Sequence, residues 1–357
     1  MKSKSNTRLI ISLAVVAVLF FLGWLVEKTQ GTQSMAVTVL QKGAVYALIA
    51  VTMNLLNGFT GLFSLGQAGF MLAGAYTYAV LTIPMAKRAA VYQYYDGGWV
   101  QLTIGFLPAM LIAGLVAALF AALIGMPVLR LKGDYLAIAT LGFAEIIRAI
   151  VQWDGIGPLT NGSNLLKTYP TLKTIMPGNT VLFTFLVVGV CIALILLLIN
   201  STYGRAFKAI RDDEVAAEAM GINLFHHKQM AFVISSFFAG IGGALLAMYQ
   251  GSLQANSFKS SMTYEILLIV VIGGMGSVSG SVLASFLFIA CSEWWLRFLD
   301  SELVIGNFQV PLLAPGFRMV VFSVVIMVVV LFFRQGIMGD RELWDLGRGG
   351  KGGKKVK

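Results

Sequence analysis

Charged residues are scarce in this chain. Asp, Glu, Lys and Arg make up 12% of its 357 residues, whereas soluble domains carry roughly 25%. Hydrophobic residues reach 58%, and the mean hydropathy is +0.83. This balance argues against a soluble domain and predicts a protein that crosses the membrane several times.

Residues that usually carry catalysis or bind metals are also few. The two histidines, His226 and His227, are adjacent, so they do not share a helix face, and no nearby Cys or carboxylate completes a metal site. The two cysteines, Cys191 and Cys291, lie in apolar runs, where packing is their expected role. No Gly-x-x-x-x-Gly-Lys-Ser/Thr phosphate loop occurs. We therefore expect no catalytic residue, no metal, no cofactor and no enzymatic activity in this chain.

The net charge of +10 comes from basic residues that flank the apolar runs. They gather in residues 2–8, 130–132, 201–228 and 334–357. The positive-inside rule expects such clusters in cytoplasmic loops. Their position therefore argues against a nucleic-acid partner and predicts that both termini are cytoplasmic.

Apolar runs close to the length that a membrane-crossing helix needs occur along most of the chain. They predict helices at residues 9–26, 35–56, 66–84, 102–128, 135–151, 180–199, 229–249, 264–272 with 281–298, and 316–333. The first run lacks a small-residue cleavage site, so we expect a membrane helix there and not a signal peptide. The predicted fold is an all-α polytopic bundle of roughly 8–10 spans with broken or re-entrant helices. Its expected parts are residues 1–34, a permease domain at 35–334 and a basic cytoplasmic tail at 335–357.

Two glycine-rich stretches interrupt apolar runs, one in each half of the chain. They are residues 57–66 and 273–280. Paired breaks of this kind indicate a transport pathway, because opened backbone is tolerated at membrane depth only beside a cavity. The alternative is that both stretches are tight loops at the membrane face.

Polar residues near these breaks are the candidates for the pathway. Open helix ends and hydroxyl or amide groups there could bind the carboxylate and ammonium of an amino acid. Glu145 and Arg148 are further candidates, since they share one helix face at membrane depth, although a structural salt bridge is the alternative. The candidate pathway residues are Asn54, Asn57, Ser64, Gln67, Thr140, Glu145, Arg148, Gly273, Gly274, Gly276 and Ser277.

The polar segment at 201–228 contains eight charged residues between two apolar runs. At its centre Asp213 can cap a short helix, and Gly221 can end it in the left-handed conformation. An isolated helix this short is marginal in water, so we expect a soluble partner to hold it. An amphipathic connector on the membrane surface is the alternative.

The run from Gly204 to Asn223, with Ala216, Ala217 and Gly221 at its centre, resembles the coupling loop of ABC importer permeases. Together with stretches at 54–68, 132–143 and 271–277, it is similar to branched-chain amino-acid permeases of the LivM type. One departure is Val215, where the general importer loop has glutamate. The resemblance implies ATPase-coupling residues at Arg211, Asp212, Glu214, Ala216, Ala217, Glu218 and Gly221.

The same resemblance implies the partners and the location. They are a second related permease in a heterodimer, two cytoplasmic ABC ATPases, an extracytoplasmic binding protein, and the bilayer of a bacterial cytoplasmic membrane. Permeases of this type for urea, amides or other amino acids stay open as alternatives. So does an ion-coupled secondary transporter, which would work without an ATPase.

Overall fold

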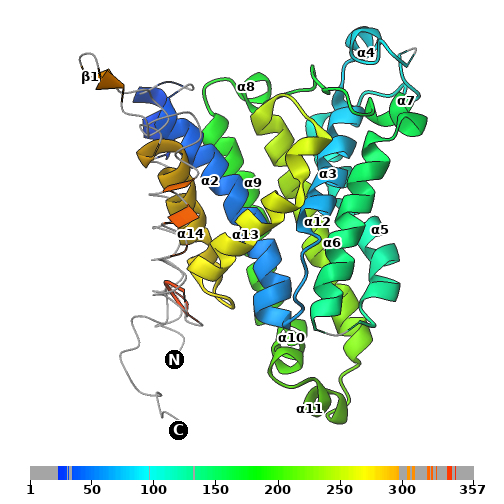
Figure 1. Ribbon diagram of the computed structural model, residues 1–357, viewed down its shortest axis with the longest axis vertical. Coiled ribbons are helices and arrows are strands. Elements are labelled where there is room, and N and C mark those ends of the chain that lie inside the picture. Colours follow the sequence, from blue (N-terminus) through cyan, green and yellow to red (C-terminus); the bar gives the residue numbers. More distant parts are fainter. Residues whose placement is uncertain are drawn as a thin grey trace, which may run out of the picture.

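The computed structural model is a bundle of helices, in which the longer helices lie roughly side by side (Figure 1). It describes residues 23–29, 31, 34–95, 97–131 and 133–296 and, towards the C-terminus, 304–305, 308–309, 320–321, 323–324, 327, 336–339 and 342. The predicted all-α fold is confirmed, and the short strands β1 (Val304–Ile305) and β2 (Phe308–Gln309) form one small antiparallel pair.

The helices that build the bundle follow one another with short connections. The first half contains α2 (Met35–Asn54), the π-helix η1 (Leu55–Thr60), α3 (Gln67–Thr82), α4 (Met85–Val91), α5 (Phe106–Val128), α6 (Asp134–Gln152), η2 (Asp154–Ile156), α7 (Gly157–Thr160) and α8 (Leu172–Ile175). The second half contains α9 (Thr180–Asn200), α10 (Thr202–Asp212), α11 (Glu214–Ala219), α12 (Leu224–Gln250), η3 (Ala255–Phe258), α13 (Ser260–Gly273), α14 (Val278–Ala290) and η4 (Cys291–Trp295).

Helices α3, α5 and α12 form a closely packed centre because small residues line their contacts. A Cβ added to Gly240 of α12 would lie 2.6 Å from the Cβ of Ala117 on α5. A Cβ on Gly74 of α3 would lie 2.2 Å from the carbonyl oxygen of Gly240. Such close backbone approach is how helices gain packing contacts inside a bilayer, where burial of Leu from lipid gains little.

The predicted spans can be compared with the helices of the described residues. Five of those helices are long and apolar enough to cross a membrane, and α6 with residues 154–160 adds a sixth as a pair bent by 61°. The predictions at 9–26 and 316–333 fall mainly on residues outside the described part of the chain, so the total of 8–10 spans stays a prediction. The same holds for the boundaries of the three expected parts.

Both glycine-rich breaks exist, but each is shorter than the sequence predicted. The chain stays helical through Thr60, because η1 continues α2 as a π-helix, and the opened backbone covers only residues 61–66. The second break covers only residues 274–277, between α13 and α14. The residues at 57–60 and 278–280 are therefore helical, which the glycine content alone did not indicate.

Candidate functional site

Asn54, the last residue of α2, joins the two helix breaks. Its Nδ2 donates to the Ser277 carbonyl oxygen at 2.9 Å and to Ser281 Oγ at 2.8 Å. Its Oδ1 accepts the Gly276 N–H at 2.9 Å. Gly58 makes room for this contact, since a Cβ there would lie 1.9 Å from Asn54 Oδ1. Two segments more than 200 residues apart therefore meet at one fully buried amide.

Side chains satisfy the backbone donors that the first break leaves open. Ser64 N–H donates to Asn57 Oδ1 at 3.1 Å, and Leu65 N–H donates to Thr140 Oγ1 at 3.0 Å. At the start of α3, Ala68 N–H donates to Thr263 Oγ1 at 3.3 Å. The polar groups around the break therefore serve first to hold its backbone.

Most of the predicted pathway residues come together at these two breaks. Gln67 Nε2 donates to Thr52 Oγ1 at 2.6 Å, and Ser277 Oγ caps α14 by accepting the Gly280 N–H at 3.1 Å. The residues gathered around the two breaks are Asn54, Asn57, Ser64, Gln67, Thr140, Gly273, Gly274, Gly276 and Ser277. Their contact with a transported solute stays a prediction.

Glu145 and Arg148 belong to a different cluster. Arg148 Nη2 pairs with Glu145 Oε2 at 2.6 Å, and its Nη1 donates to Asn256 Oδ1 at 3.3 Å. Glu145 Oε1 accepts from both the N–H and the hydroxyl of Ser260. The pair thus ties α6 to η3 and to the first residue of α13, the arrangement that the salt-bridge alternative describes.

The polar segment at 201–228 folds as two short helices, α10 and α11, at one end of the bundle (Figure 1). Asp213 Oδ1 accepts the Val215 and Ala216 N–H groups at 2.9 and 3.1 Å, which confirms the predicted cap. Gly221, two residues after the end of α11, has φ +85°, and nothing lies within 4 Å of a Cβ placed there. The tip exposes two large apolar side chains, Val215 at 77% and Met220 at 83%.

The other predicted coupling residues lie around this tip. Three of them are exposed, namely Asp212, Ala216 and Glu218, whereas Ala217 is the buried residue of α11. Glu214 forms an ion pair of 2.6 Å with Lys228 at the start of α12, a contact that the sequence analysis did not anticipate. No sequence pattern indicated this ion pair, because the two residues are on different helices.

Arg211 links α10 to the first break. Its Nη1 donates to the Gly58 carbonyl oxygen at 2.9 Å. A Cβ added to Gly61 would lie 3.2 Å from the Arg211 Cα, so the two backbones are in close contact. Lys208, one turn earlier on α10, lies 5.5 Å from the centre of the Phe59 ring. The polar segment therefore rests directly on the π-helix η1, which the sequence analysis did not predict.

The C-terminal residues 336–339 and 342 contact the second break and the helix ends beside it. Ile337 N–H donates to the Ile272 carbonyl oxygen at 2.7 Å, and Glu342 Oε1 accepts the Val278 N–H at 2.8 Å. Glu342 also bonds the N–H and hydroxyl of Ser279, so its carboxylate caps the positive end of α14. The sequence analysis treated this region as a basic tail and missed the contact.

A polar pocket of about 530 Å³ lies at the end of the bundle opposite α11, beside α8. It is lined by Thr38, Gln41, Thr171, Leu172, Lys173, Met248, Tyr249, Gln250 and Gly251. Nearby on α2, Lys42 pairs with Glu293 and lies 5.7 Å from the Tyr46 ring centre. Among the described residues, no three His, Cys, Asp or Glu side chains gather as a metal site.

A bundle of apolar helices with two joined helix breaks and a polar segment at one end is the architecture expected of a polytopic membrane protein. The family model of the branched-chain amino acid transport system permease component matches residues 35–331, and the chain belongs to this family. This membership and the LivM relatives described below confirm the predicted resemblance to LivM-type permeases. The prediction that the protein crosses the membrane several times is also confirmed. The description of the family is that of a transport-system permease component.

Characterised relatives agree with this assignment. The chain is 33% identical over 330 residues to the high-affinity branched-chain amino acid transport system permease protein LivM of Escherichia coli K12, covering 84% of this chain and 71% of that protein. It is 34% identical over 295 residues to LivM of Salmonella typhimurium, covering 74% and 65%. It is also 23% identical to LivH of Escherichia coli K12, covering 84% and 93%. No solved structure matches the chain.

Proposed function

We propose that this chain is the membrane subunit of an ATP-driven importer of branched-chain amino acids. The names of its LivM and LivH relatives support this substrate and a second, related permease as its partner. Since the chain carries no phosphate loop, the energy would come from two ABC ATPases. A binding protein outside the cell would deliver the solute, and both termini would lie in the cytoplasm.

The observation that carries the proposal is the contact between the polar segment and the first break. Val215 and Met220 would enter an apolar groove on the ATPase, since large exposed apolar side chains on a soluble tip favour a protein partner. Motion of α10 would then act on η1 through Arg211 and the Gly58 carbonyl. Asn54 would pass it on to the second break.

The solute would enter through the polar pocket on the opposite end. Lys173 there could bind the carboxylate, and the hydroxyl and amide groups could bind the ammonium. At the first break, Asn57 Nδ2 is buried without a hydrogen-bond partner among the described residues. It is a free donor for a carboxylate that reaches this depth.

Gly221→Trp tests the coupling role. The site is open and exposed, so the fold should survive, while a positive φ and a bulky ring distort the tip that the ATPase would bind. We expect normal insertion in the membrane, loss of ATPase co-purification and loss of leucine uptake. Full uptake by this variant would contradict the coupling role. Arg205→Ala, at an exposed position of α10 outside the predicted coupling residues, serves as the control for general damage to the loop.

A further inference from the structure

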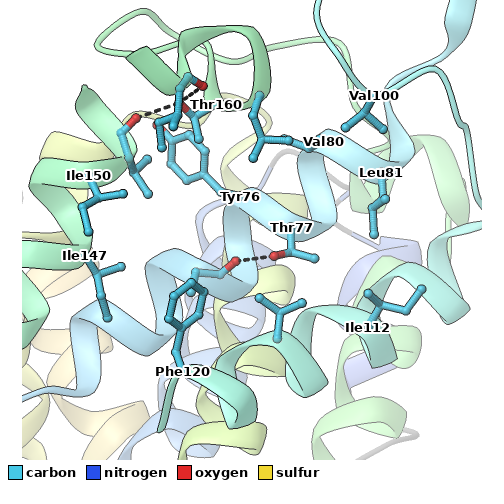
Figure 2. A pocket seen from close by; sticks show the side chains of 15 residues that line it. Tyr76, Thr77, Val80, Leu81, Val100, Ile112, Phe120, Ile147, Ile150 and Thr160 are labelled. Carbon is cyan, nitrogen blue, oxygen red and sulfur yellow. Dashed lines mark hydrogen bonds between the residues drawn. The ribbon is translucent and has the colours of Figure 1, made fainter. Parts of the chain in front are cut away.

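An apolar groove lies between α3, α5 and α6 in the half of the bundle opposite α11 (Figure 2). Figure 2 shows Phe120 at its lower end, Ile147 and Ile150 on one side, and Val100 and Thr160 near the top. Its volume is about 450 Å³. It is lined by Ala73, Tyr76, Thr77, Val80, Leu81, Val100, Ile112, Val116, Phe120, Ile147, Ile150, Val151, Ile156, Leu159 and Thr160.

The threonines of the groove offer little to a polar ligand. Thr77 Oγ1 donates to the Ala73 carbonyl oxygen at 2.7 Å, and Thr160 Oγ1 donates to the Val151 and Ile156 carbonyl oxygens. Both hydroxyl protons are therefore used by the backbone. The lining contains no charged side chain, and its remaining polar group is the hydroxyl of Tyr76. A zwitterionic amino acid would lose more hydration here than one phenol can replace, so the groove does not fit the transported solute.

The groove is continuous with a helix face that has the composition of a lipid contact. Next to Ile112, Val116 and Phe120, α5 exposes a row of large apolar residues with a spacing of four: Leu107, Leu111, Leu115, Leu119 and Leu123. Most of the small residues of α5, such as Ala113 and Ala117, are buried against the bundle centre. Helix–helix interfaces in membranes favour small residues, so this face suits lipid and not a second permease.

The upper end of the groove lies at an aromatic belt. Trp99 precedes Val100 and is 67% exposed, and Trp153 follows the end of α6 and is 64% exposed. Exposed tryptophans mark the level of lipid headgroups. The groove thus begins at that level and runs towards the middle of the bilayer, as one lipid tail does.

From these observations we infer that the groove is a binding site for a single acyl chain of a membrane phospholipid. The chain enters between α5 and α6 from the leaflet on the side of α4 and α7, and it lies against Tyr76 and Val80 of α3. Binding there fills a space that the helices leave open, and it holds α6 against α3. The occupant is recognised by apolar contact alone.

Photocrosslinking in proteoliposomes tests this site. Phospholipid with a diazirine on one acyl chain is irradiated with the reconstituted protein, and adducts are mapped by mass spectrometry. We expect adducts concentrated on α3 and on the groove side of α6. Val116→Trp should reduce them about tenfold, which corresponds to displacing about two buried methylenes, whereas Leu115→Trp, on the neighbouring lipid-facing row, should leave them unchanged.

Three outcomes would overturn the inference. They are adducts spread evenly over the lipid-facing rows of α5 and α9, adducts lost in the presence of excess leucine, and crosslinks to another permease chain from a photoreactive residue at Ile150. Ala73→Leu fills the groove from α3 and must reduce the lipid adducts as much as Val116→Trp does. Because two different variants are compared, a folding defect in one of them does not decide the result.

Discussion

The two helix breaks have similar glycine content, yet they are built and connected differently. In the first break a π-helix runs into a segment whose N–H groups bond side chains from η1 and α6, and the Ala68 N–H at the start of α3 bonds a side chain from α13. In the second break a turn of four residues separates α13 from α14, and Glu342 caps the new helix. The first contacts α10, and the second contacts the C-terminal residues.

This difference leads us to expect different parts for the two breaks in transport. A segment held by side chains from several different elements can change its bonds one at a time, whereas a short capped turn moves with the helix that it begins. We therefore expect the first break to respond to the ATPase and the second to follow through Asn54. Variants that cut one contact at a time can separate the two.

Asn54→Ala should have the largest effect, because it separates the breaks from each other. The substitution leaves the buried Gly276 N–H without its acceptor and removes the amide donor to the Ser277 carbonyl, which keeps its bonds from Ser281. The expected cost is about 3 kcal/mol in the free energy of unfolding. We expect a marked fall in thermal stability in detergent and loss of uptake. Asn54→Asp keeps the acceptor for Gly276 but loses the amide donors, so its thermal stability should lie between those of the unchanged protein and Asn54→Ala. Equal stability of these three proteins would contradict the role of Asn54.

Arg211→Ala should leave the breaks joined but disconnect the first from α10. We expect transport per ATP hydrolysed to fall about tenfold, as the loss of one charge-assisted bond would give, with ATPase binding retained. The reconstituted complex allows both rates to be measured together. Arg205, exposed on the same helix, provides the matched control, and an equal loss in Arg205→Ala would show that α10 charge in general is responsible.

Glu342→Gln should have the smallest effect, since it weakens only the cap of α14. Removing a carboxylate from a helix N-terminus costs about 0.5–1 kcal/mol. We expect a small drop in melting temperature and uptake close to that of the unchanged protein. A loss of transport as large as that of Arg211→Ala would mean that the second break is driven directly from the C-terminal residues.

The sequence predicted the parts of this site better than their contacts. Composition and apolar run length led to the helical bundle, and Asp213 and Gly221 marked the ends of α11, because a cap and a left-handed glycine act within one helical turn. Glycine content located both breaks but not their length. The extra helical turn at Leu55–Thr60 follows Asn54, whose side chain bonds Gly276 in the other half of the chain, and a local pattern does not reveal such a contact.

Contacts between distant segments account for what the sequence did not predict. The bonds from Arg211 to Gly58 and from Glu342 to Val278 have no periodic pattern behind them. For Glu145 and Arg148 the spacing correctly placed both side chains on one face of α6, yet their bonds to Asn256 and Ser260 depend on where α13 begins. The apolar groove is likewise lined by residues of α3, α5 and α6 that are separated in the sequence.

Labelling of a cysteine at the tip of α11 tests the central claim most directly. Val215→Cys is placed in a protein in which Cys191 and Cys291 are replaced by serine, and a membrane-impermeant maleimide is applied to vesicles of either orientation. The account predicts reaction only in inside-out vesicles and protection when the ATPase subunits are bound. Reaction in right-side-out vesicles, or no protection by the ATPases, would contradict it.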